Sequence, residues 1–223
     1  MATPSYSARI AFVSQGGLRE RKKEQTRQLI YDAARKLFEA KGFDRVSVAE
    51  VARAADVSEV TVFNYFSTKE DLFYGGMQFF EEELIESVRS RPKGEPALKA
   101  FRRTLLARAD RLATKQSAEA ISRAAHAIPA SPSLAARERG IVERYTARLA
   151  ELLAEETGAE PGDIVPISMA GALMTTHRAL VSYVRGRVLA GLRGERLAEE
   201  YRAQARRAFA RLERGLGDYA VKR

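Results

Sequence analysis

The sequence contains no cysteine, no tryptophan and only two histidines. Without cysteine the chain cannot form disulfide bonds, a thiolate nucleophile or a cysteine-ligated zinc or iron site. His126 and His177 are the two imidazoles, and the neighbours of His177 at helical spacing include Leu173, Leu180 and Val181. None of these neighbours can share a metal ion or relay a proton. We therefore expect structural or pocket-lining histidines, with no metal site and no cofactor.

Motifs of common enzymes are also missing. Gly186, Gly191 and Gly194 do not have the spacing of a phosphate-binding loop and are not followed by Lys-Ser or Lys-Thr. The sequence has no G-x-S-x-G motif, which would mark a nucleophilic serine on a sharp turn. These absences predict a protein that is not an enzyme, and an all-α enzyme is kept as the weaker alternative.

Long hydrophobic runs are absent as well. The longest, residues 164–176, is interrupted by Pro166 and falls short of the roughly 20 apolar residues that a spanning helix needs. The N-terminal residues hold one short apolar cluster, residues 10–13, and no signal-peptide core. We predict a flexible tail over residues 1–17 and a soluble, cytoplasmic protein without a membrane partner.

Basic residues, in contrast, are plentiful. The 38 Lys and Arg residues exceed the 29 Asp and Glu residues, which gives a net charge of +9 and a pI near 9.9. This excess favours an anionic partner such as nucleic acid, although charge alone does not identify one. With 223 residues, 45% of them hydrophobic, the chain is long enough to bury a core.

Apolar residues recur at three-to-four spacing along the chain, and no segment alternates in the way that a strand does. The pattern predicts an all-α protein of about nine helices. Their expected ranges are 18–41, 47–55, 58–66, 67–90, 96–113, 117–127, 133–156, 163–185 and 195–216.

Local signals mark the ends of the first helices. Gly42 is expected in a left-handed C-cap, and Ser47 with Glu50 has the spacing of a capping box. Asp56 occupies the turn before the next helix, where a short polar side chain tolerates positive φ. Ser58 is the expected N-cap of the helix that follows. Two short helices joined by a tight turn predict a helix-turn-helix, with residues 58–66 as the recognition helix.

The outer face of that recognition helix has the chemistry of a base-reading surface. Val62 and Phe66 share one face, and Val60 and Asn64 lie most nearly opposite, flanked by Thr61 and Phe63. An amide can pair with adenine, and a hydroxyl and methyl groups complete a compact, uncharged surface for the major groove. Phosphate contacts are expected around this face from Arg45, Ser47, Ser58, Tyr65, Lys69 and the N-terminus of the fourth helix.

The same region resembles a known family. Residues 25–73, with "AARKLF", "GFDRVSV", "VARAADVS" and "TVFNYFSTKEDL", are similar to the DNA-binding domain of the TetR/AcrR family of transcriptional regulators. The resemblance implies a homodimeric, ligand-responsive regulator, usually a repressor, that binds a double-stranded DNA operator. It also implies a homeodomain-like three-helix domain over residues 18–67 and a helical effector-binding and dimerisation domain over residues 68–223.

Family positions that contact DNA fall on defined residues of this chain. Two departures from the family pattern are Asp56, where glycine is usual, and Phe63, where tyrosine is usual and would bring a phosphate-binding hydroxyl. Glu59 has a second interpretation, as an acid favoured by the helix dipole. The implied contacts are Ser47, Ser58, Glu59, Val60, Thr61, Phe63, Asn64, Tyr65 and Lys69.

Two alternatives to a specific regulator stay open. A helix-turn-helix pattern is also compatible with a purely structural helical hairpin. A basic DNA-binding protein is also compatible with non-specific, nucleoid-type coating of DNA, which would protect all sequences rather than one short dyad.

The C-terminal helices offer candidates for the effector pocket and the dimer interface. The pocket candidates are Phe80, Leu84, Phe101, Leu105, Met174, His177 and Arg178. Small or apolar stripes suggest dimer contacts, although packing within one chain explains such stripes equally well. The dimer candidates are Ala170, Gly171, Leu197, Tyr201, Ala205, Ala208 and Leu212.

The segment 178–214 holds ten arginines against four glutamates. Such a run is usually a solvated helix face. The sharper hypothesis is that some of these arginines bind the phosphates of an anionic effector such as an acyl-CoA, whose acyl chain enters the helical bundle.

Overall fold

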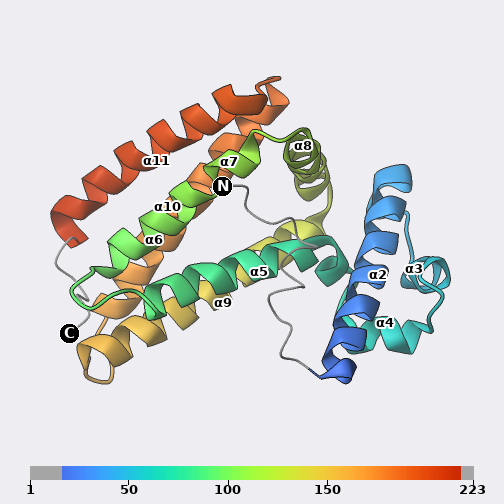
Figure 1. Ribbon diagram of the computed structural model, residues 1–223, viewed down its shortest axis with the longest axis horizontal. Helices are drawn as coiled ribbons and strands as arrows, with labels where there is room; N and C mark the ends of the chain where they lie inside the picture. The colour runs from blue at the N-terminus through green and yellow to red at the C-terminus, as the bar shows by residue number, and fades with distance from the viewer. Residues whose placement is uncertain (1–16, 217–223) are drawn as a thin grey trace. The chain divides into compact units, whose positions relative to one another are not determined.

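The computed structural model describes residues 17–216 (Figure 1), and every regular element within that range is a helix. The predicted all-α class is therefore confirmed. The predicted N-terminal tail lies outside the described residues, apart from Gly17. The chain divides into two compact units, one up to Gly75 and the other from Gly76. Between residues 17 and 216 no helix is apolar over a sufficient length to cross a membrane.

The first unit contains α2 (Leu18–Lys41), α3 (Val48–Ala54), α4 (Glu59–Tyr65) and the start of α5 (Lys69–Arg89). These helices begin and end within one or two residues of the predicted positions, because their boundaries are set by local capping signals. Their apolar faces meet in one core around a shared set of fully or nearly fully buried side chains. The core contains Ile30, Ala34, Val46, Val51, Ala52, Ala55, Val62, Phe66 and Leu72.

The end of α2 differs in one detail from the sequence-based expectation. Gly42 has a positive φ of 82°, as glycine allows, but its ψ of 154° lies outside the left-handed helical region. The Gly42 N–H still bonds to the Phe38 carbonyl at 2.9 Å. Gly42 therefore leads the chain directly into the extended segment before α3.

The second unit contains the rest of α5 and six further helices. These are α6 (Ala97–Ala107), α7 (Ala109–Leu112), α8 (Lys115–Ala130), α9 (Pro132–Thr157), α10 (Val165–Leu189) and α11 (Gly194–Leu216). Within this unit α10 packs against α8, α9 and α11, and α11 also packs against α6 and α7 (Figure 1). Phe101 of α6 and Phe209 of α11 are both fully buried, with ring centroids 6.2 Å apart.

Three helix boundaries in this unit depart from the prediction. The single helix expected over 96–113 is interrupted at Arg108, which separates α6 from α7. Helix α8 continues through Pro129. This proline lies in the last turn, where it removes only one hydrogen bond, and the Ser131 N–H still bonds back to the Ala127 carbonyl. Helix α10 extends to Leu189 and passes through Gly186, where the sequence suggested a stop.

Candidate DNA-binding site

Helix α3 is held at its start by the predicted capping box. The Glu50 N–H donates to the Ser47 hydroxyl at 3.2 Å, and the Glu50 carboxylate accepts from the Ser47 N–H at 2.9 Å. Lys41 also donates to Glu50 at 2.7 Å, and this hydrogen bond is the main reason that the pKa of the Glu50 carboxyl falls to about 2. The Glu50 carboxylate of the capping box therefore stays ionised at neutral pH.

Replacing Ser47 with alanine should lower the free energy of unfolding by about 1 kcal/mol, because the Glu50 N–H loses the hydroxyl that accepts its hydrogen bond. Chemical denaturation monitored by circular dichroism measures this. Ser182→Ala is a suitable control, since Ser182 is exposed on α10, and should change stability by less than about 0.5 kcal/mol. Equal effects in the two variants would contradict the role of the capping box.

The turn between α3 and α4 depends on Asp56. Its φ of 51° makes it the single non-glycine residue with positive φ among those described. The turn is closed by hydrogen bonds from the Val57 N–H to the Ala52 carbonyl at 3.0 Å and from the Asp56 N–H to Arg53 at 3.2 Å. An aspartate tolerates this conformation better than most side chains, so the departure from the family's glycine preserves the turn.

Helix α4 divides into a buried face and an exposed face, as its spacing predicts. Val62 and Phe66 are 1% and 3% exposed and belong to the core of the first unit. Val60 is 69% exposed and Phe63 48%, and Asn64 is also exposed. The remaining members of the predicted site are Ser58 and Glu59, which are exposed, and Thr61 and Tyr65, which are partly buried.

Both ends of α4 are fixed by side chains. At its start the Ser58 hydroxyl accepts from the Thr61 N–H at 3.0 Å and lies 2.8 Å from the Thr61 hydroxyl. At its end Arg27 of α2 donates to the Tyr65 carbonyl at 3.2 Å, and its guanidinium lies 4.7 Å from the Phe66 ring centroid. These contacts hold the exposed face in one orientation relative to the rest of the first unit.

The start of α5 forms a second capping box beside this face. The Asp71 N–H donates to the Thr68 hydroxyl at 3.2 Å, and the Thr68 N–H donates to the Asp71 carboxylate at 3.1 Å. Lys69 places its ammonium 4.3 Å from the Phe43 ring centroid and 3.4 Å from the Asp44 carbonyl. Two contacts within the first unit therefore position the Lys69 ammonium.

Arg45 and Ser47 lie on the segment that leads into α3, and both are exposed. The Arg45 guanidinium donates to the Lys41 carbonyl at 2.6 Å. It retains further N–H groups for a phosphate, because a guanidinium carries five donors. The Ser47 hydroxyl donates to the Glu50 carboxylate at 3.1 Å and accepts from the Glu50 N–H, so its single O–H would have to turn away from Glu50 to donate to a phosphate.

Residues 30–74 match the family model described as bacterial regulatory proteins of the tetR family. The chain belongs to the TetR/AcrR family. The matched residues cover the second half of α2, the whole helix-turn-helix and the first residues of α5, which are the elements that build the site described above. A TetR/AcrR-type helix-turn-helix is a DNA-binding module of transcriptional regulators, so the purely structural hairpin is set aside.

Curated relatives and solved structures agree with this membership. The chain is 28% identical over 152 residues to the HTH-type transcriptional regulator TcmR of Streptomyces glaucescens, covering 66% of this chain and 67% of TcmR. It is also 28% identical over 159 residues to the transcriptional regulator MftR of Mycobacterium tuberculosis, covering 69% of this chain and 77% of MftR. The structure of Salmonella enterica GusR has the same fold, with a TM-score of 0.54 at 20% identity over 86% of this chain and 96% of GusR.

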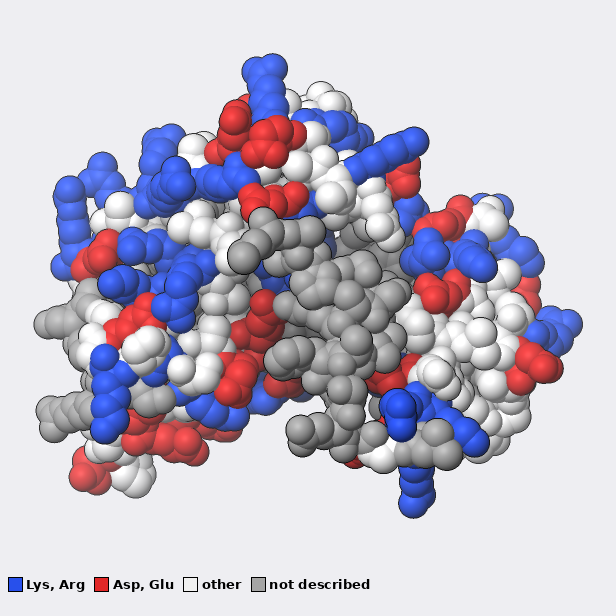
Figure 2. Space-filling model, in the orientation of Figure 1, with Lys and Arg blue, Asp and Glu red and all other residues white. Residues whose placement is uncertain are grey.

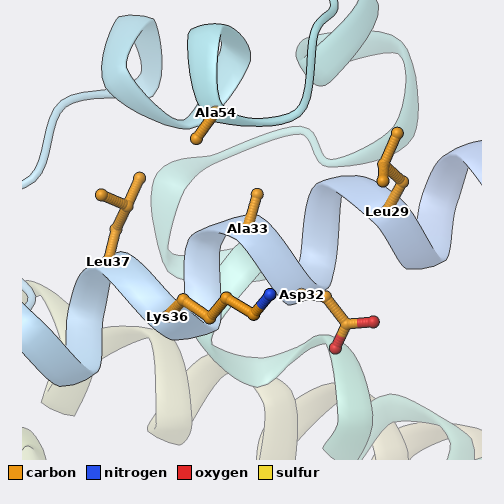
Figure 3. A pocket seen from close by; sticks show the side chains of 6 residues that line it. All are labelled: Leu29, Asp32, Ala33, Lys36, Leu37 and Ala54. Atoms are coloured by element: carbon orange, nitrogen blue, oxygen red, sulfur yellow. The ribbon is translucent and has the colours of Figure 1, made fainter.

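A hollow of about 250 Å³ lies on another side of the TetR/AcrR DNA-binding unit (Figure 3). Figure 3 shows the side chains of Leu29, Ala33 and Leu37 directed from α2 toward Ala54 of α3, with Asp32 and Lys36 at the edge. Leu29 is 52% exposed. None of the residues predicted to contact DNA lines this hollow, so it is separate from the α4 face.

The residues predicted for the effector pocket all belong to the second unit, but they differ in burial. Phe80 is partly buried, and Arg178 points to solvent. Arg178 therefore does not line the interior of the bundle in this structure. The buried members are Leu84, Phe101, Leu105, Met174 and His177.

The residues predicted for the dimer interface lie mostly inside one chain. Ala170, Leu197, Tyr201 and Ala205 are buried, and Ala208, Leu212 and Gly171 are partly buried. Because α11 packs against α6, α7 and α10, its apolar stripe is accounted for by packing within one chain. Of the predicted set, Gly171 faces open space, since nothing lies within 4 Å of the position that a Cβ would occupy.

Many side chains of the basic segment 178–214 form ion pairs or hydrogen bonds within the protein. Arg185 pairs with Glu138, Arg187 with Glu200, and Arg202 with Glu195 and Asp110. Figure 2 shows Lys and Arg side chains crowded along the side of the second unit that α11 forms. Those that are exposed and have no ion pair within the described residues are Arg178, Arg193, Arg206, Arg207, Arg211 and Arg214.

Sequence reasoning missed three charged groups of the second unit. Glu81 is 5% exposed, Arg108 lies at the break between α6 and α7, and Glu83 pairs with Arg108. A signal for Glu81 was present, because it precedes Ile85 by four residues and Val88 by seven and so shares their apolar face. For Arg108 and Glu83 no comparable local signal exists.

Proposed function

We propose that the protein is a ligand-responsive transcriptional repressor that binds a palindromic operator as a homodimer, one α4 helix per half-site. The observation that carries this proposal is the compact, uncharged outer face of α4, where Val60, Thr61 and Asn64 stand opposite the buried Val62 and Phe66. A face intended only for solvent would normally carry charged side chains. This one matches the donors, acceptors and methyl groups of the major groove.

The surrounding residues take positioning roles in this proposal. Arg45, Ser47, Ser58, Tyr65 and Lys69 contact phosphates and fix the register of α4, while Asn64 and Thr61 read base edges. Phe63 has no hydroxyl, so it contributes apolar contact in place of a phosphate bond. Glu59 acts through the dipole at the start of α4 rather than as a base reader.

The decisive experiment is selection of bound fragments from random duplex DNA, followed by footprinting of the enriched sequence. A specific regulator protects one short dyad and leaves neighbouring sequence open. Uniform protection along the duplex would instead favour the nucleoid-type alternative. The proposal also implies a cytoplasmic location, where operator DNA is found.

We propose further that the two copies meet along the outer face of α10. Ile164, just before the helix, and Ile167 are 72% and 46% exposed, and Ser168, Gly171 and Thr175 continue the same stripe with small side chains. Small residues allow two helices to approach closely, and exposed apolar side chains supply area to bury. This face is therefore better suited to a second copy than the charged outer face of α11.

Replacing Gly171 with lysine should convert the dimer to a monomer, because a long cation would stand on the two-fold contact, while the added Cβ meets nothing within 4 Å in its own chain. We expect dissociation to increase by at least about tenfold, or roughly 1.4 kcal/mol. Light scattering after size-exclusion chromatography measures the mass of the particle. Ala120→Lys, at an exposed site on α8, should leave that mass unchanged, and an unchanged mass for Gly171→Lys would exclude this face.

The effector is proposed to bind in the second unit and to act through α5. Helix α5 begins beside the recognition helix and continues into the second unit, so displacing it would change the separation of the two α4 helices in a dimer. We propose an acyl-CoA-like effector, whose phosphates Arg178, Arg206, Arg207 and Arg211 could receive. Thermal stabilisation by a long-chain acyl-CoA supports this choice, and no shift with any thioester removes it.

A further inference from the structure

Three helical elements of the second unit bring together one aromatic ring and two polar groups. The ring of Phe80 on α5 lies 5.1 Å, centroid to centroid, from the imidazole of His177 on α10, in an edge-to-face arrangement. The guanidinium of Arg108, at the junction of α6 and α7, lies 4.0 Å from the centroid of the same ring. We refer to Phe80, Arg108 and His177 as the imidazole cluster.

His177 has no hydrogen-bonding partner among the described residues, although it is only 8% exposed. Its Nδ1 is fully buried. Burial, with a smaller effect from the positive charge of Arg108, lowers the pKa of His177 to about 4. The ring is therefore neutral near pH 7 and carries one N–H donor. Buried polar groups almost always have partners, so an unpartnered one points to a missing group.

Arg108 is placed by the same interruption that the sequence did not predict. It has φ and ψ of −91° and −6°, which ends α6 and starts α7 one residue later. Its guanidinium pairs with Glu83 of α5. Nearby, the Tyr201 hydroxyl lies 3.4 Å from the Leu105 carbonyl, and the charge of Arg108 also acts on it. Arg108 is thus the charged group that acts on His177, and Glu83 and Tyr201 are linked to His177 through Arg108.

We infer that the imidazole cluster binds the acyl oxygen of the effector, either a carbonyl or a carboxylate, with the apolar chain among the buried side chains of the bundle. This inference rests on the proposed function, because it names the chemical group that the effector presents. His177 and Arg108 both offer N–H donors and so select a hydrogen-bond acceptor. A cationic ligand such as an amine is disfavoured by the charge of Arg108.

Two sources supply such an oxygen, and their charge distinguishes them. A free carboxylic acid brings a negative charge, which competes with Glu83 for Arg108 and favours protonation of His177. A thioester brings a neutral carbonyl, which accepts a hydrogen bond and leaves His177 uncharged. Binding of the acid should therefore take up a proton near neutral pH, and binding of the thioester should not.

The test uses full-length protein labelled with ¹⁵N in histidine, which gives signals from two imidazoles. His126 is exposed and serves as an internal reference. The probes are decanoate, decanoyl-CoA and decylamine. We expect the His177 signals to move with decanoate or with decanoyl-CoA, and not with decylamine. Protonation of His177 on binding identifies the acid as the source.

A matched pair of variants links this site to DNA release. His177→Phe should need at least tenfold more of the active probe to release operator DNA. His126→Phe should respond as the wild type does. Should His177→Phe fail to fold, the wild-type imidazole signals decide the matter alone.

Two outcomes overturn the inference. His177 signals that stay fixed with both acyl probes exclude the site, and so does a His177→Phe variant that responds like the wild type. The proposed function fails separately if the protein selects no DNA sequence. The imidazole signals still test the ligand site then, because they do not depend on DNA binding.

Discussion

The wild-type protein should lose stability between pH 6.5 and pH 8, and replacing Glu81 with glutamine should abolish most of that loss. The Glu81 carboxyl is 5% exposed, and its Oε2 has no hydrogen-bond partner within the described residues. Burial raises its pKa to about 8, against an ordinary value of 4.5, with Glu138 and Glu82 adding to the rise and Arg144 opposing it. The folded protein therefore keeps this carboxyl protonated at neutral pH.

The sign of the effect follows from proton binding. Above pH 4.5 the unfolded chain loses the Glu81 proton while the folded chain retains it until about pH 8. Over that window the folded state binds more protons, so the free energy of unfolding falls as pH rises, by about 1.4 kcal/mol for each pH unit. By pH 8 the accumulated loss is roughly 5 kcal/mol, which is large against a typical domain stability of about 5–15 kcal/mol.

His177 has the opposite dependence in a lower range. Its pKa of about 4 in the folded protein, against 6.5 ordinarily, means that the unfolded chain binds more protons between these values. Stability therefore rises with pH from about 4 to 6.5 on account of His177. The two groups oppose each other below pH 6.5, and the effect of Glu81 is isolated between pH 6.5 and 8.

Urea denaturation at pH 6.5 and pH 8 measures the prediction. The wild type should lose about 2 kcal/mol over this interval, and Glu81→Gln should lose little, because its amide does not ionise. Glu82→Gln is the matched control, since the neighbouring Glu82 is exposed, pairs with Arg148 and has a lowered pKa for that reason. Parallel pH dependence in the wild type and in Glu81→Gln would show that Glu81 ionises normally in the fold.

Replacing Asn64 with alanine should reduce discrimination at one base pair of each half-site by about 1–3 kcal/mol, or roughly 5- to 150-fold. The reason is that the exposed amide of Asn64 can make two hydrogen bonds to adenine in the major groove, and alanine makes none. Competition between the selected operator and its single-base variants measures the loss. The preference at every other base pair should be retained.

Lys69→Ala provides the contrast within the same interface. Loss of the Lys69 cation should weaken binding to all sequences alike, because a phosphate contact carries no sequence information. The slope of the logarithm of the binding constant against the logarithm of the salt concentration should fall by about one. Arg211→Ala removes the same charge from α11, where the side chain is exposed, and should leave the slope unchanged. If Asn64→Ala weakens all sequences equally, α4 does not read bases through this residue.

Local signals were sufficient to predict the helix-turn-helix. The Ser47–Glu50 capping box, the Ser58 N-cap and the positive φ of Asp56 each depend on residues within four positions of one another. The division of α4 into a buried and an exposed face follows from helical geometry alone. For the same reason the sequence predicted that Val62 and Phe66 are buried while Val60 and Asn64 are exposed.

Interactions between distant segments could not be predicted in this way. The stripe of Leu197, Tyr201 and Ala205 has the same periodicity whether it meets α6 and α7 of its own chain or a second copy, and the tertiary structure places it inside the chain. The interruption at Arg108 is similar, because its neighbours in sequence are good helix formers. Its pairing with Glu83, 25 residues away, has no signature in either segment.

The sequence by itself determined the helical class, the caps and turn of the DNA-binding unit, and the residues on the outer face of α4. It did so because helix formation and capping depend on groups a few residues apart. Only the tertiary structure decided which arginines of the C-terminal segment are neutralised by ion pairs, and that Glu81 and His177 lie buried in the second unit. Burial and ion pairing depend on which distant helices pack together, and helical periodicity does not specify the partner.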